Sequence, residues 1–361
     1  MTAVLVRDLA LERWPSMDRY AEAIAGRLGD VIVPAEWRTL GGPRYLTRYW
    51  TYPRALRRYR GDLVHVLDHS YAHCLRAFRG VPSVVTVHDL LPLRTIAAGR
   101  LGLRSRVRNR LLQWVLDWVP RADRVIVTTQ YTAREAGQFI DVDPQRIRII
   151  PMGVDGRFFD RPAEAALAAR RAQWIAALGG AEPPAALVLH VGSCHPRKNV
   201  EAAIAALGIL RAHGVDAALV QIGGAFGPAH VAAIREAGVA AHVVQEREVA
   251  EDALVAAYYA ADALVLPSSF EGWGLPAVEA MAAGLPVVTS GAAGLREAVG
   301  EAGLVVGGMG ADPIAAALER VLTDPALRAD LAAKGRARAA SLTWDRCASQ
   351  TRAVHDELLG R

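Results

Sequence analysis

The sequence predicts an α/β protein made of two doubly wound parallel-sheet domains. Short apolar runs alternate with amphipathic stretches along the whole chain of 361 residues. Regular alternation of strand and helix is typical of parallel sheets that carry helices on both faces. The alternation forms two series with a break between them, and a chain of this length exceeds one ordinary domain.

Each series supplies enough strands for one doubly wound sheet. The expected strands of the first series are Val4–Val6, Val31–Val33, Leu63–Leu67, Ser83–Val87, Arg124–Thr128 and Arg146–Ile150. Those of the second are Ala186–Val191, Ala217–Ile222, His242–Val244, Ala263–Leu266, Val287–Thr289 and Leu304–Val306. The expected helices include Asp18–Leu28, Arg104–Val119, Asn199–His213, Ala277–Ala283 and Asp312–Leu322.

The break between the two series follows PMGVDGRFFD at 151–160. An Ala- and Arg-rich helix comes next and leads into GGAEPPA at 179–185. Gly and Pro at that density interrupt regular structure. The expected domains are therefore residues 1–165 and 180–342, with a last helical segment at 343–361.

The composition indicates a globular protein of a reducing compartment. No apolar run approaches the roughly 18–20 residues that a membrane-spanning helix needs, and the start of the chain lacks the long apolar core of a signal peptide. The cysteines Cys74, Cys194 and Cys347 are scattered, without the spacing of a disulfide framework or a zinc site. We expect a cytoplasmic location.

The net charge of +5 is distributed unevenly. Residues 1–160 contain 25 Arg and 16 acids, giving +9, and the rest contain 17 Arg plus Lys and 21 acids, giving −4. Arginines interleave with aromatic residues at 43–60 and 99–121, which suits peripheral binding to an anionic membrane surface on the inner face of the cell membrane. A solvated helix face in an arginine-rich chain is the alternative. No nucleic-acid module is recognisable, so no nucleic-acid partner is expected.

The first candidate binding loop lies in LVLHVGSCHPRKNVEAAIAAL, at 187–207. Gly192 follows a buried strand and allows a backbone to approach a ligand, and the next helix presents its N-terminal amides. Arg197 and Lys198, one of only two lysines in the chain, suit a diphosphate there. Asn199 is expected to cap the helix. The alternative is an exposed basic loop with no ligand.

The second candidate loop lies in ALVLPSSFEGWGLPAVEAMAAGLPVV, at 263–288. Glu271 falls in the loop and Glu279 one turn into the following helix, so the helix start lies between the two carboxylates. Phosphate oxygens fit the amides of Gly274 and Leu275, and a carboxylate can accept hydrogen bonds from a pair of sugar hydroxyls. Dipole stabilisation of an acid near a helix N-terminus would explain Glu279 without any ligand.

These residues carry a family resemblance. SFEGWGLPAVEAMAAGLPVV resembles the signature of retaining glycosyltransferases of family four, whose two glutamates are separated by seven residues. VGSCHPRKN resembles the family's phosphate loop in the form found among mannosyltransferases of bacterial surface-polysaccharide pathways. RIRIIPMGVD at 146–155 and VTVHDLLPLR at 85–94 are similar to two further family segments. The resemblance implies a GT-B fold, with two facing Rossmann-like domains and a final helix crossing back to the first.

The resemblance also implies roles for individual residues. Glu279 would hold the ribose diol of the nucleotide, and Glu271 would contact hydroxyls of the transferred sugar. Lys198 and Arg197 would neutralise the leaving diphosphate, and His88 would lie beside the reacting carbon. The remaining donor-binding positions would be Gly192, Ser193, Gly272, Trp273, Gly274 and Leu275. The family often carries arginine where this chain has Ser193, and Arg197 is the candidate to replace it.

The expected activity is transfer of a hexose with retained anomeric configuration to a glycan or lipid-linked acceptor. The resemblance favours mannose from GDP-mannose, with a UDP-sugar as the alternative. A sugar-nucleotide epimerase, a phosphorylase and a catalytically silent binding module are the other classes left open.

No cofactor or metal is expected, because Lys198 and helix amides can stabilise the leaving group. We interpret the Asp141–Asp143 pair as a turn rather than a metal site. His65, His69 and His73, in and after the first domain's third strand, are candidates to line the acceptor side. For His88 the alternative is a hydrogen-bonded structural residue, as is common for a histidine at a strand end.

Overall fold

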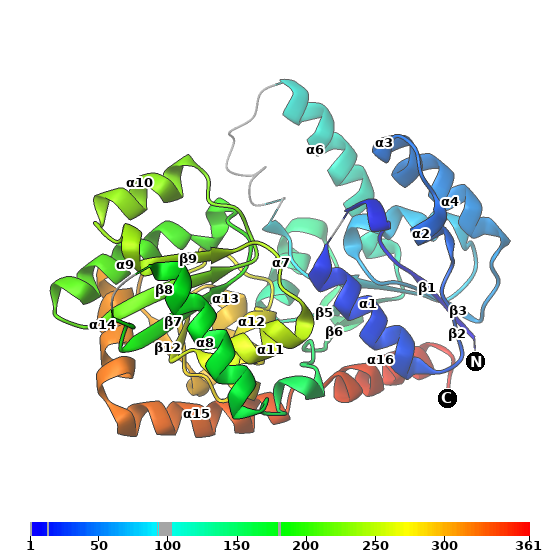
Figure 1. Ribbon diagram of the computed structural model, residues 1–361. Coiled ribbons are helices and arrows are strands. Elements are labelled where there is room, and N and C mark those ends of the chain that lie inside the picture. The colour runs from blue at the N-terminus through cyan, green and yellow to red at the C-terminus, as the bar shows by residue number, and fades with distance from the viewer. Residues whose placement is uncertain (1, 13, 92, 94–102, 180–181) are drawn as a thin grey trace. The chain divides into compact units, whose positions relative to one another are not determined.

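The computed structural model describes residues 2–12, 14–91, 93, 103–179 and 182–361, with the backbone alone described at 103–108. The chain forms two compact units (Figure 1). Unit 1 contains residues 1–153 and 344–361, and unit 2 contains residues 154–343. All the predicted strands are present within two residues of their expected bounds. They form two parallel six-stranded sheets, which confirms the predicted fold class.

The sheet of unit 1 has the strand order β2-β1-β3-β4-β5-β6. Its strands are β1 (Ala3–Val6), β2 (Val31–Ile32), β3 (Leu63–Val66), β4 (Ser83–Val87), β5 (Arg124–Val127) and β6 (Ile147–Ile149). Its α-helices are α1 (Pro15–Leu28), α2 (Glu36–Thr39), α3 (Arg44–Leu46), α4 (Tyr52–Ala55), α6 (Leu103–Leu116), α7 (Gln130–Ile140) and α16 (Trp344–Leu358). Shorter helical turns are η1 (Ala10–Glu12), η2 (Thr47–Thr51), η3 (Leu56–Arg58), η4 (His69–Ala77), η5 (Val119–Arg121) and η6 (Pro144–Arg146).

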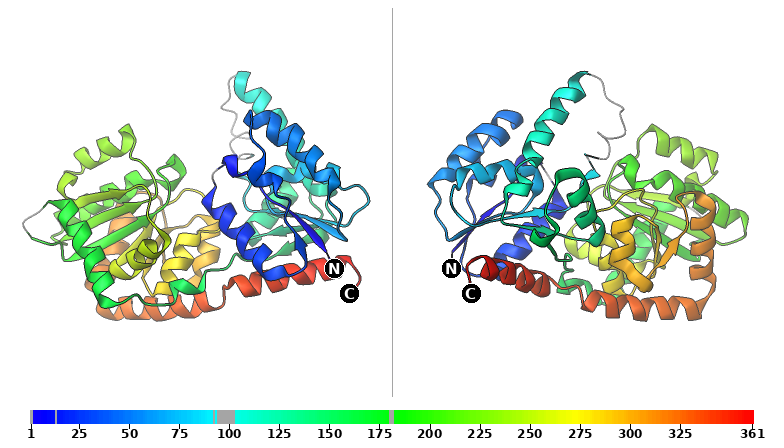
Figure 2. Two further views of the ribbon diagram at one scale, coloured as in Figure 1. Left: turned by 45° about the vertical axis from the view of Figure 1, so that its right-hand side comes forward. Right: turned by 180° about the vertical axis from the view of Figure 1, so that it is seen from behind.

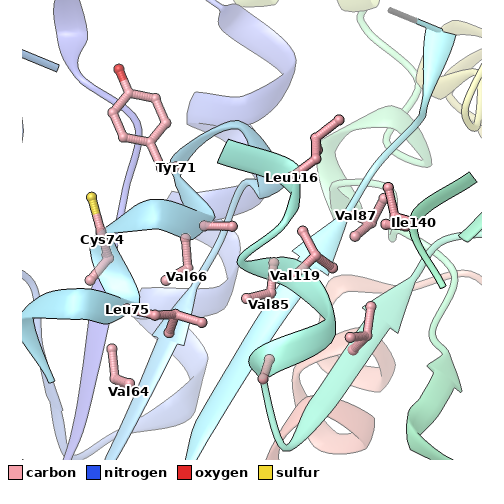
Figure 3. Packing of buried hydrophobic residues seen from close by; sticks show 14 of the residues in the cluster. Val64, Val66, Tyr71, Cys74, Leu75, Val85, Val87, Leu116, Val119 and Ile140 are labelled. Carbon is pink, nitrogen blue, oxygen red and sulfur yellow. The ribbon is translucent and has the colours of Figure 1, made fainter. Parts of the chain in front are cut away.

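One face of this sheet carries an apolar core because alternate residues of a strand point to the same side. Val64 and Val66 of β3 pack with residues of β4 and with Tyr71 of η4, and all of them are buried (Figure 3). Leu116 closes the cluster from the end of α6. These contacts explain why the long basic helix predicted at 104–119 ends as a buried anchor in the core of unit 1.

The opposite face of the same sheet contains a buried polar network and receives the last helix of the chain. His65 of β3 and Thr86 of β4 are fully buried, and their side chains are 2.8 Å apart between Nε2 and Oγ1. Tyr20 of α1 reaches the same Thr86 oxygen at 3.1 Å, and His355 of α16 lies 3.1 Å from His65 Nδ1. Helices α1 and α16 contact each other and lie side by side in the ribbon views (Figures 1 and 2). The final helix therefore returns to the first unit, as the family resemblance implies.

Two of the three histidines suggested for the acceptor side are structural, so that expectation is wrong for them. His65 lies inside β3 and belongs to the buried network with Thr86 and His355. His73 is fully buried in η4, where its Nε2 lies 3.0 Å from the carbonyl oxygen of Arg48. Burial lowers the pKa of His73 to about 3, so its ring is neutral at physiological pH. His69 is buried at the carboxyl edge of the sheet, 3.6 Å from Asp68.

The sheet of unit 2 has the strand order β12-β11-β10-β7-β8-β9. Its strands are β7 (Ala186–Val191), β8 (Ala217–Ile222), β9 (Val243–Glu246), β10 (Ala263–Leu266), β11 (Val287–Ser290) and β12 (Leu304–Val306). Its α-helices are α8 (Glu164–Leu178), α9 (Val200–Ala212), α10 (Pro228–Glu236), α11 (Glu251–Ala260), α12 (Leu275–Ala283), α13 (Ala293–Val299), α14 (Ala311–Thr323) and α15 (Pro325–Ala340). Shorter turns are η7 (Gly156–Phe158), η8 (Pro196–Lys198), η9 (Ala240–His242) and η10 (Gly300–Ala302). Helices α9 and α14 pack together over one face, and α8, α11 and α12 cover the other.

The structure divides the chain earlier than the sequence suggests. Residues 154–165, assigned above to the first domain, belong to unit 2. They are held there because Val154 N donates to Leu342 O at 2.8 Å and Tyr259 OH donates to Phe158 O at 3.0 Å. Helix α8 then packs on α11. The boundary follows these contacts, which the Gly- and Pro-rich segment at 179–185 does not reveal.

Among the described residues, none of the helices combines the length and the apolar character needed to cross a membrane.

Candidate functional site

Two loops of unit 2 meet at the point where the strand order reverses. The chain runs from β7 to β8 and β9 on one side of β7, and later returns to place β10 on its other side. Ligands of open α/β sheets bind beyond the carboxyl ends of the strands at this kind of switch point. The loops at 192–199 and 267–274 follow β7 and β10 there. They are the two loops that the sequence singled out.

The structure brings Lys198, Arg197 and Glu271 into one ion-pair network. Lys198 Nζ lies 2.5 Å from Glu271 Oε1, and Arg197 Nη1 donates to Glu271 Oε2 at 3.0 Å. Ser268 Oγ donates to Glu271 Oε1 at 2.9 Å. Lys198 and Glu271 are only 8% and 7% exposed. Two cations and a hydroxyl therefore converge on one buried carboxylate at the switch point.

The charge state of Glu271 follows from two opposing effects. Burial disfavours the ionised form and by itself would raise the pKa of the carboxyl group. The positive charges of Lys198 and Arg197, helped by the hydrogen bonds from Lys198 and Ser268, outweigh burial and lower the pKa. Glu271 is therefore an ionised acceptor at neutral pH, and the site pairs negative charge with an adjacent cationic wall.

The two loops are also tied together by Asn199, and here the predicted helix cap is wrong. Asn199 has a left-handed backbone with φ of 54°, and its side chain makes no capping hydrogen bond to α9. Its Nδ2 instead donates to the carbonyl oxygens of Pro267 at 3.1 Å and Met309 at 2.9 Å. Asn199 thus links the loop at 192–199 to the loop at 267–274, which we call the glutamate loop. The residues that set this role are distant from Asn199 in the sequence.

Two glycines give the glutamate loop the room it needs. Gly274 precedes α12 with a φ of 109°, and a Cβ there would lie 2.4 Å from Leu295 Cδ2. Gly294 lies in α13, where a Cβ would come within 2.2 Å of the carbonyl oxygen of Glu271. No side chain fits at that distance, so α13 packs directly against the loop backbone. The sequence indicates Gly274 as part of the loop but carries no signal for Gly294.

Glu279 lies in the first turns of α12 and is 3% exposed. Tyr258, on α11, donates a hydrogen bond from its hydroxyl to Glu279 Oε2 at 2.7 Å. Pro276 stands in the first turn of α12, where the missing backbone N–H of proline leaves no helix hydrogen bond unmade. The start of α12 therefore lies between Glu271 and Glu279.

A buried histidine with no recognisable motif around it in the sequence lies next to this network. His190 of β7 is fully buried, and neither ring nitrogen has a hydrogen-bond partner among the described residues. Burial, reinforced by the charge of Lys198, lowers its pKa to about 3. Its ring and the end of the Lys198 side chain both lie next to Gly192, where a Cβ would be 3.6 Å from His190 Cε1 and 3.5 Å from Lys198 Nζ. A neutral imidazole there adds no competing charge to the site.

The remaining predicted positions occupy different environments. Ser193 is exposed, Trp273 is buried in the loop that leads into α12, and Leu275 is buried as the first residue of that helix. Gly272 lies close to Gly294.

His88 belongs to unit 1, directly after β4, where its Nε2 lies 2.9 Å from Leu67 O and its ring packs edge-on against Tyr20. Burial lowers the pKa of His88, so this ring is neutral as well.

The Asp141–Asp143 pair forms a turn, as predicted. Asp141 ends α7 with a left-handed φ of 51°, and Asp143 Oδ1 accepts a hydrogen bond from Gln145 N at 2.9 Å. Over the part of the chain that the structure describes, no three or more His, Cys, Asp or Glu side chains are grouped to hold a metal ion.

Two family models match the chain, one in each half. The model described as Glycosyltransferase Family 4 matches residues 10–157, and that described as Glycosyl transferases group 1 matches residues 179–338. Together they cover most of both units.

Named relatives agree with these models. The chain is 35% identical to the D-inositol 3-phosphate glycosyltransferase of Acidothermus cellulolyticus over 278 residues, which are 74% of this chain and 60% of the relative. It is 29% identical to the MMP alpha-(1->4)-mannosyltransferase of Mycolicibacterium hassiacum over 381 residues, covering 97% of this chain and 86% of that protein. The chain spans 60% and 64% of the first two curated relatives that it matches.

Solved structures extend the comparison to the whole fold. Anabaena HepE in complex with UDP and glucose matches with a TM-score of 0.79 and 18% identity, over 99% of this chain and 100% of that one. At this identity the match concerns the fold, which is the two-domain Rossmann-like GT-B fold. With both halves matched by family models and relatives named as glycosyltransferases, the chain belongs to glycosyltransferase family 4.

Proposed function

We propose that this protein is a retaining hexosyltransferase that uses a nucleotide sugar as donor. The carrying observation is the buried network in which Lys198 and Arg197 converge on Glu271 at the switch point of unit 2. A nucleoside diphosphate sugar presents a diphosphate and sugar hydroxyls a few ångströms apart. The network offers two cations for the first and an ionised carboxylate for the second.

The chemistry follows from the charges that develop during transfer. Cleavage of the bond between the anomeric carbon and phosphate oxygen places negative charge on the diphosphate. Lys198, Arg197 and the N-terminal amides of α12 would stabilise that charge, because donors already fixed in place need no reorganisation. Glu271 would accept hydrogen bonds from the sugar, and Glu279 from the ribose. The proposed place of His88 beside the reacting carbon comes from the family resemblance.

GDP-mannose is the favoured donor, and a UDP-sugar is the alternative. The mannosyltransferase named among the relatives supports the first, and the UDP and glucose bound to Anabaena HepE support the second. The acceptor is proposed to be a glycan or a lipid-linked sugar in polysaccharide or glycolipid synthesis. We also propose that transfer needs no metal ion, because Lys198 and Arg197 supply the positive charge.

Thermal unfolding in the presence of nucleotide sugars tests the donor. A ligand that binds only the folded protein stabilises it by about 2.7 kcal/mol at a hundred times its dissociation constant. We expect GDP-mannose to raise the melting temperature most, and transfer to persist in EDTA.

Glu271→Gln should keep the fold and lose transfer, whereas Glu182→Gln, a control at an exposed position, should change neither. Failure of every nucleotide sugar to raise the melting temperature would argue against the proposal.

We further propose peripheral binding to an anionic membrane through the segment Arg44–Arg58 of unit 1. Tyr45, Leu46 and Trp50 are 62%, 53% and 55% exposed, and the guanidinium of Arg54 lies 5.0 Å from the Trp50 ring. Exposed aromatic and basic side chains together suit the headgroup region of a bilayer. The second basic stretch, 99–121, lies partly outside the described residues. Within this stretch, side chains are described only from residue 109 onward.

Co-sedimentation with vesicles tests this surface. Phosphatidylcholine vesicles that contain phosphatidylglycerol should retain more protein than pure phosphatidylcholine vesicles. Trp50→Ala should lower the bound fraction by about threefold or more, because an interfacial tryptophan contributes substantial apolar area. Val231→Ala, at an exposed apolar position in unit 2, is the matched control and should bind normally. Equal binding to both kinds of vesicle would contradict electrostatic docking.

A further inference from the structure

A tyrosine on a neighbouring helix holds the carboxylate proposed to bind ribose. Tyr258 is 1% exposed and Glu279 is 3% exposed. The Tyr258 hydroxyl donates to Glu279 Oε2 at 2.7 Å. A hydrogen bond to an ionised acceptor is shorter and stronger than one between neutral groups. The two residues come from α11 and α12, so the bond fixes a side chain of the donor-site helix against a separate element.

Tyr258 is itself fixed by the segment with which unit 2 begins. The ring of Phe158, in η7, packs edge-on against the Tyr258 ring with the centroids 5.7 Å apart. The next residue, Tyr259, donates from its hydroxyl to the carbonyl oxygen of Phe158 at 3.0 Å. Because an aromatic ring has few rotatable bonds, a clamped tyrosine places its hydroxyl with little freedom.

Packing alone does not account for this pair. Two apolar side chains of similar volume would fill the same space without the cost of burying a carboxylate. A glutamate side chain has three rotatable bonds, and it binds a diol well only when both oxygens are held in the right plane. The Tyr258 hydroxyl, anchored from α11, supplies that constraint.

We propose that Tyr258 is a positioning residue that orients Glu279 toward the two ribose hydroxyls of a bound nucleoside diphosphate. The inference rests on the proposed function, since it requires Glu279 to bind the ribose diol. It adds to the donor site a residue that lies outside the loops at 192–199 and 267–274. It also connects that site, through Phe158, to the turn at the start of unit 2.

Titration calorimetry with nucleoside diphosphates tests the role of the hydroxyl. The probes are GDP and UDP, and the 2′,3′-dideoxy form of whichever binds more tightly. In the wild type, loss of both ribose hydroxyls should weaken binding about 10- to 100-fold, as expected for hydrogen bonds to a charged group. Tyr258→Phe should weaken binding of the ribose form about 5- to 20-fold and of the dideoxy form less than about 2-fold. Tyr59→Phe removes a hydroxyl that donates to another carboxylate, Glu36 Oε2 at 2.7 Å in unit 1, and should alter neither value.

A second pair of variants covers the case in which Tyr258→Phe alone unfolds because Glu279 has lost the hydrogen bond from Tyr258. In a Glu279→Gln background, the further change Tyr258→Phe should leave the affinity for the ribose form unchanged. Equal weakening of both probes by Tyr258→Phe, or no weakening of either, overturns the positioning role while the proposed function stands. A further loss in the Glu279→Gln background overturns it too. If the wild type itself does not distinguish ribose from dideoxyribose, the proposed role of Glu279 fails, and this inference fails with it.

Discussion

Lys198→Met is expected to lower the rate of sugar transfer by about 10²- to 10³-fold, the loss seen when one fixed donor to a developing anion is removed. Methionine keeps the length and apolar stem of lysine, so the lost element is the charge beside Glu271. The nucleoside diphosphate should also bind more weakly, because Arg197 alone would face its phosphates. The measurements are the release of nucleoside diphosphate during transfer and calorimetric titration with the same product.

The same substitution should lower the free energy of unfolding by about 1.5–3 kcal/mol, the range for a hydrogen bond to a charged group. In this variant the buried carboxylate of Glu271 would keep only the hydrogen bonds from Arg197 and Ser268. Because Lys198 helps to hold the pKa of Glu271 below its ordinary value of 4.5, its contribution is present above that pH and fades as the pH falls. The difference between the wild type and Lys198→Met should therefore shrink in acid.

Lys334→Met is the matched control, since Lys334 is the other lysine of the chain. It is half exposed on α15, where it pairs with Asp330 one helical turn away. An exposed pair of this kind contributes about 0.3–0.5 kcal/mol, so stability and transfer should both stay close to wild type. If Lys198→Met transfers sugar at a rate within about threefold of wild type, Lys198 does not stabilise the charge of the leaving diphosphate.

Gly294→Ala is expected to reduce transfer by two orders of magnitude or more, although the glycine contacts no proposed ligand. A Cβ at this position would lie 2.2 Å from Glu271 O and 2.7 Å from the carbonyl carbon of Gly272. The loop backbone must move by about 1 Å to relieve that contact, and a displacement of this size in a catalytic site costs about 10²-fold. Overpacking should also lower the free energy of unfolding by about 1–3 kcal/mol.

The control for this substitution is Gly26→Ala, at a helical glycine of α1 where a Cβ would meet no atom within 4 Å. Alanine there should stabilise the protein by up to about 1 kcal/mol and leave transfer unchanged. Nucleoside diphosphate affinity separates local from general effects, because Gly294→Ala should weaken binding at temperatures where it remains folded. If Gly294→Ala transfers sugar normally, the loop at 271–274 does not need the backbone position seen here.

The sequence predicted the parts of the fold that depend on local pattern. Buried parallel strands are continuous apolar runs, and every expected run became a strand. Helices α9 and α14 also lie close to their expected bounds. The short helical turns between residues 36 and 58 were not predicted, because their aromatic and basic residues have no clear period. Those turns are fixed by contacts such as Tyr52 OH to Arg7 O at 3.0 Å.

The candidate site was predictable to the same extent. Lys198 and Glu271 follow strands, in loops whose glycine, proline and charge content differs from the surrounding chain, and Glu279 lies one turn into the helix after the second loop. That the two loops meet follows from the strand order, which places β7 beside β10. Strand order is decided by packing between segments about seventy residues apart in the chain and has no local signature.

By itself, then, the sequence determined the class of the fold, the two loops and the residue types that bear their charge, because strand periodicity and loop chemistry are local properties. Tertiary structure alone decided which groups touch. It paired Lys198 with Glu271 and Tyr258 with Glu279, turned Asn199 from a helix cap into a link between loops, and made His65 a structural residue. Such contacts join separate elements of the chain, so they depend on how those elements pack and have no signature in the local sequence.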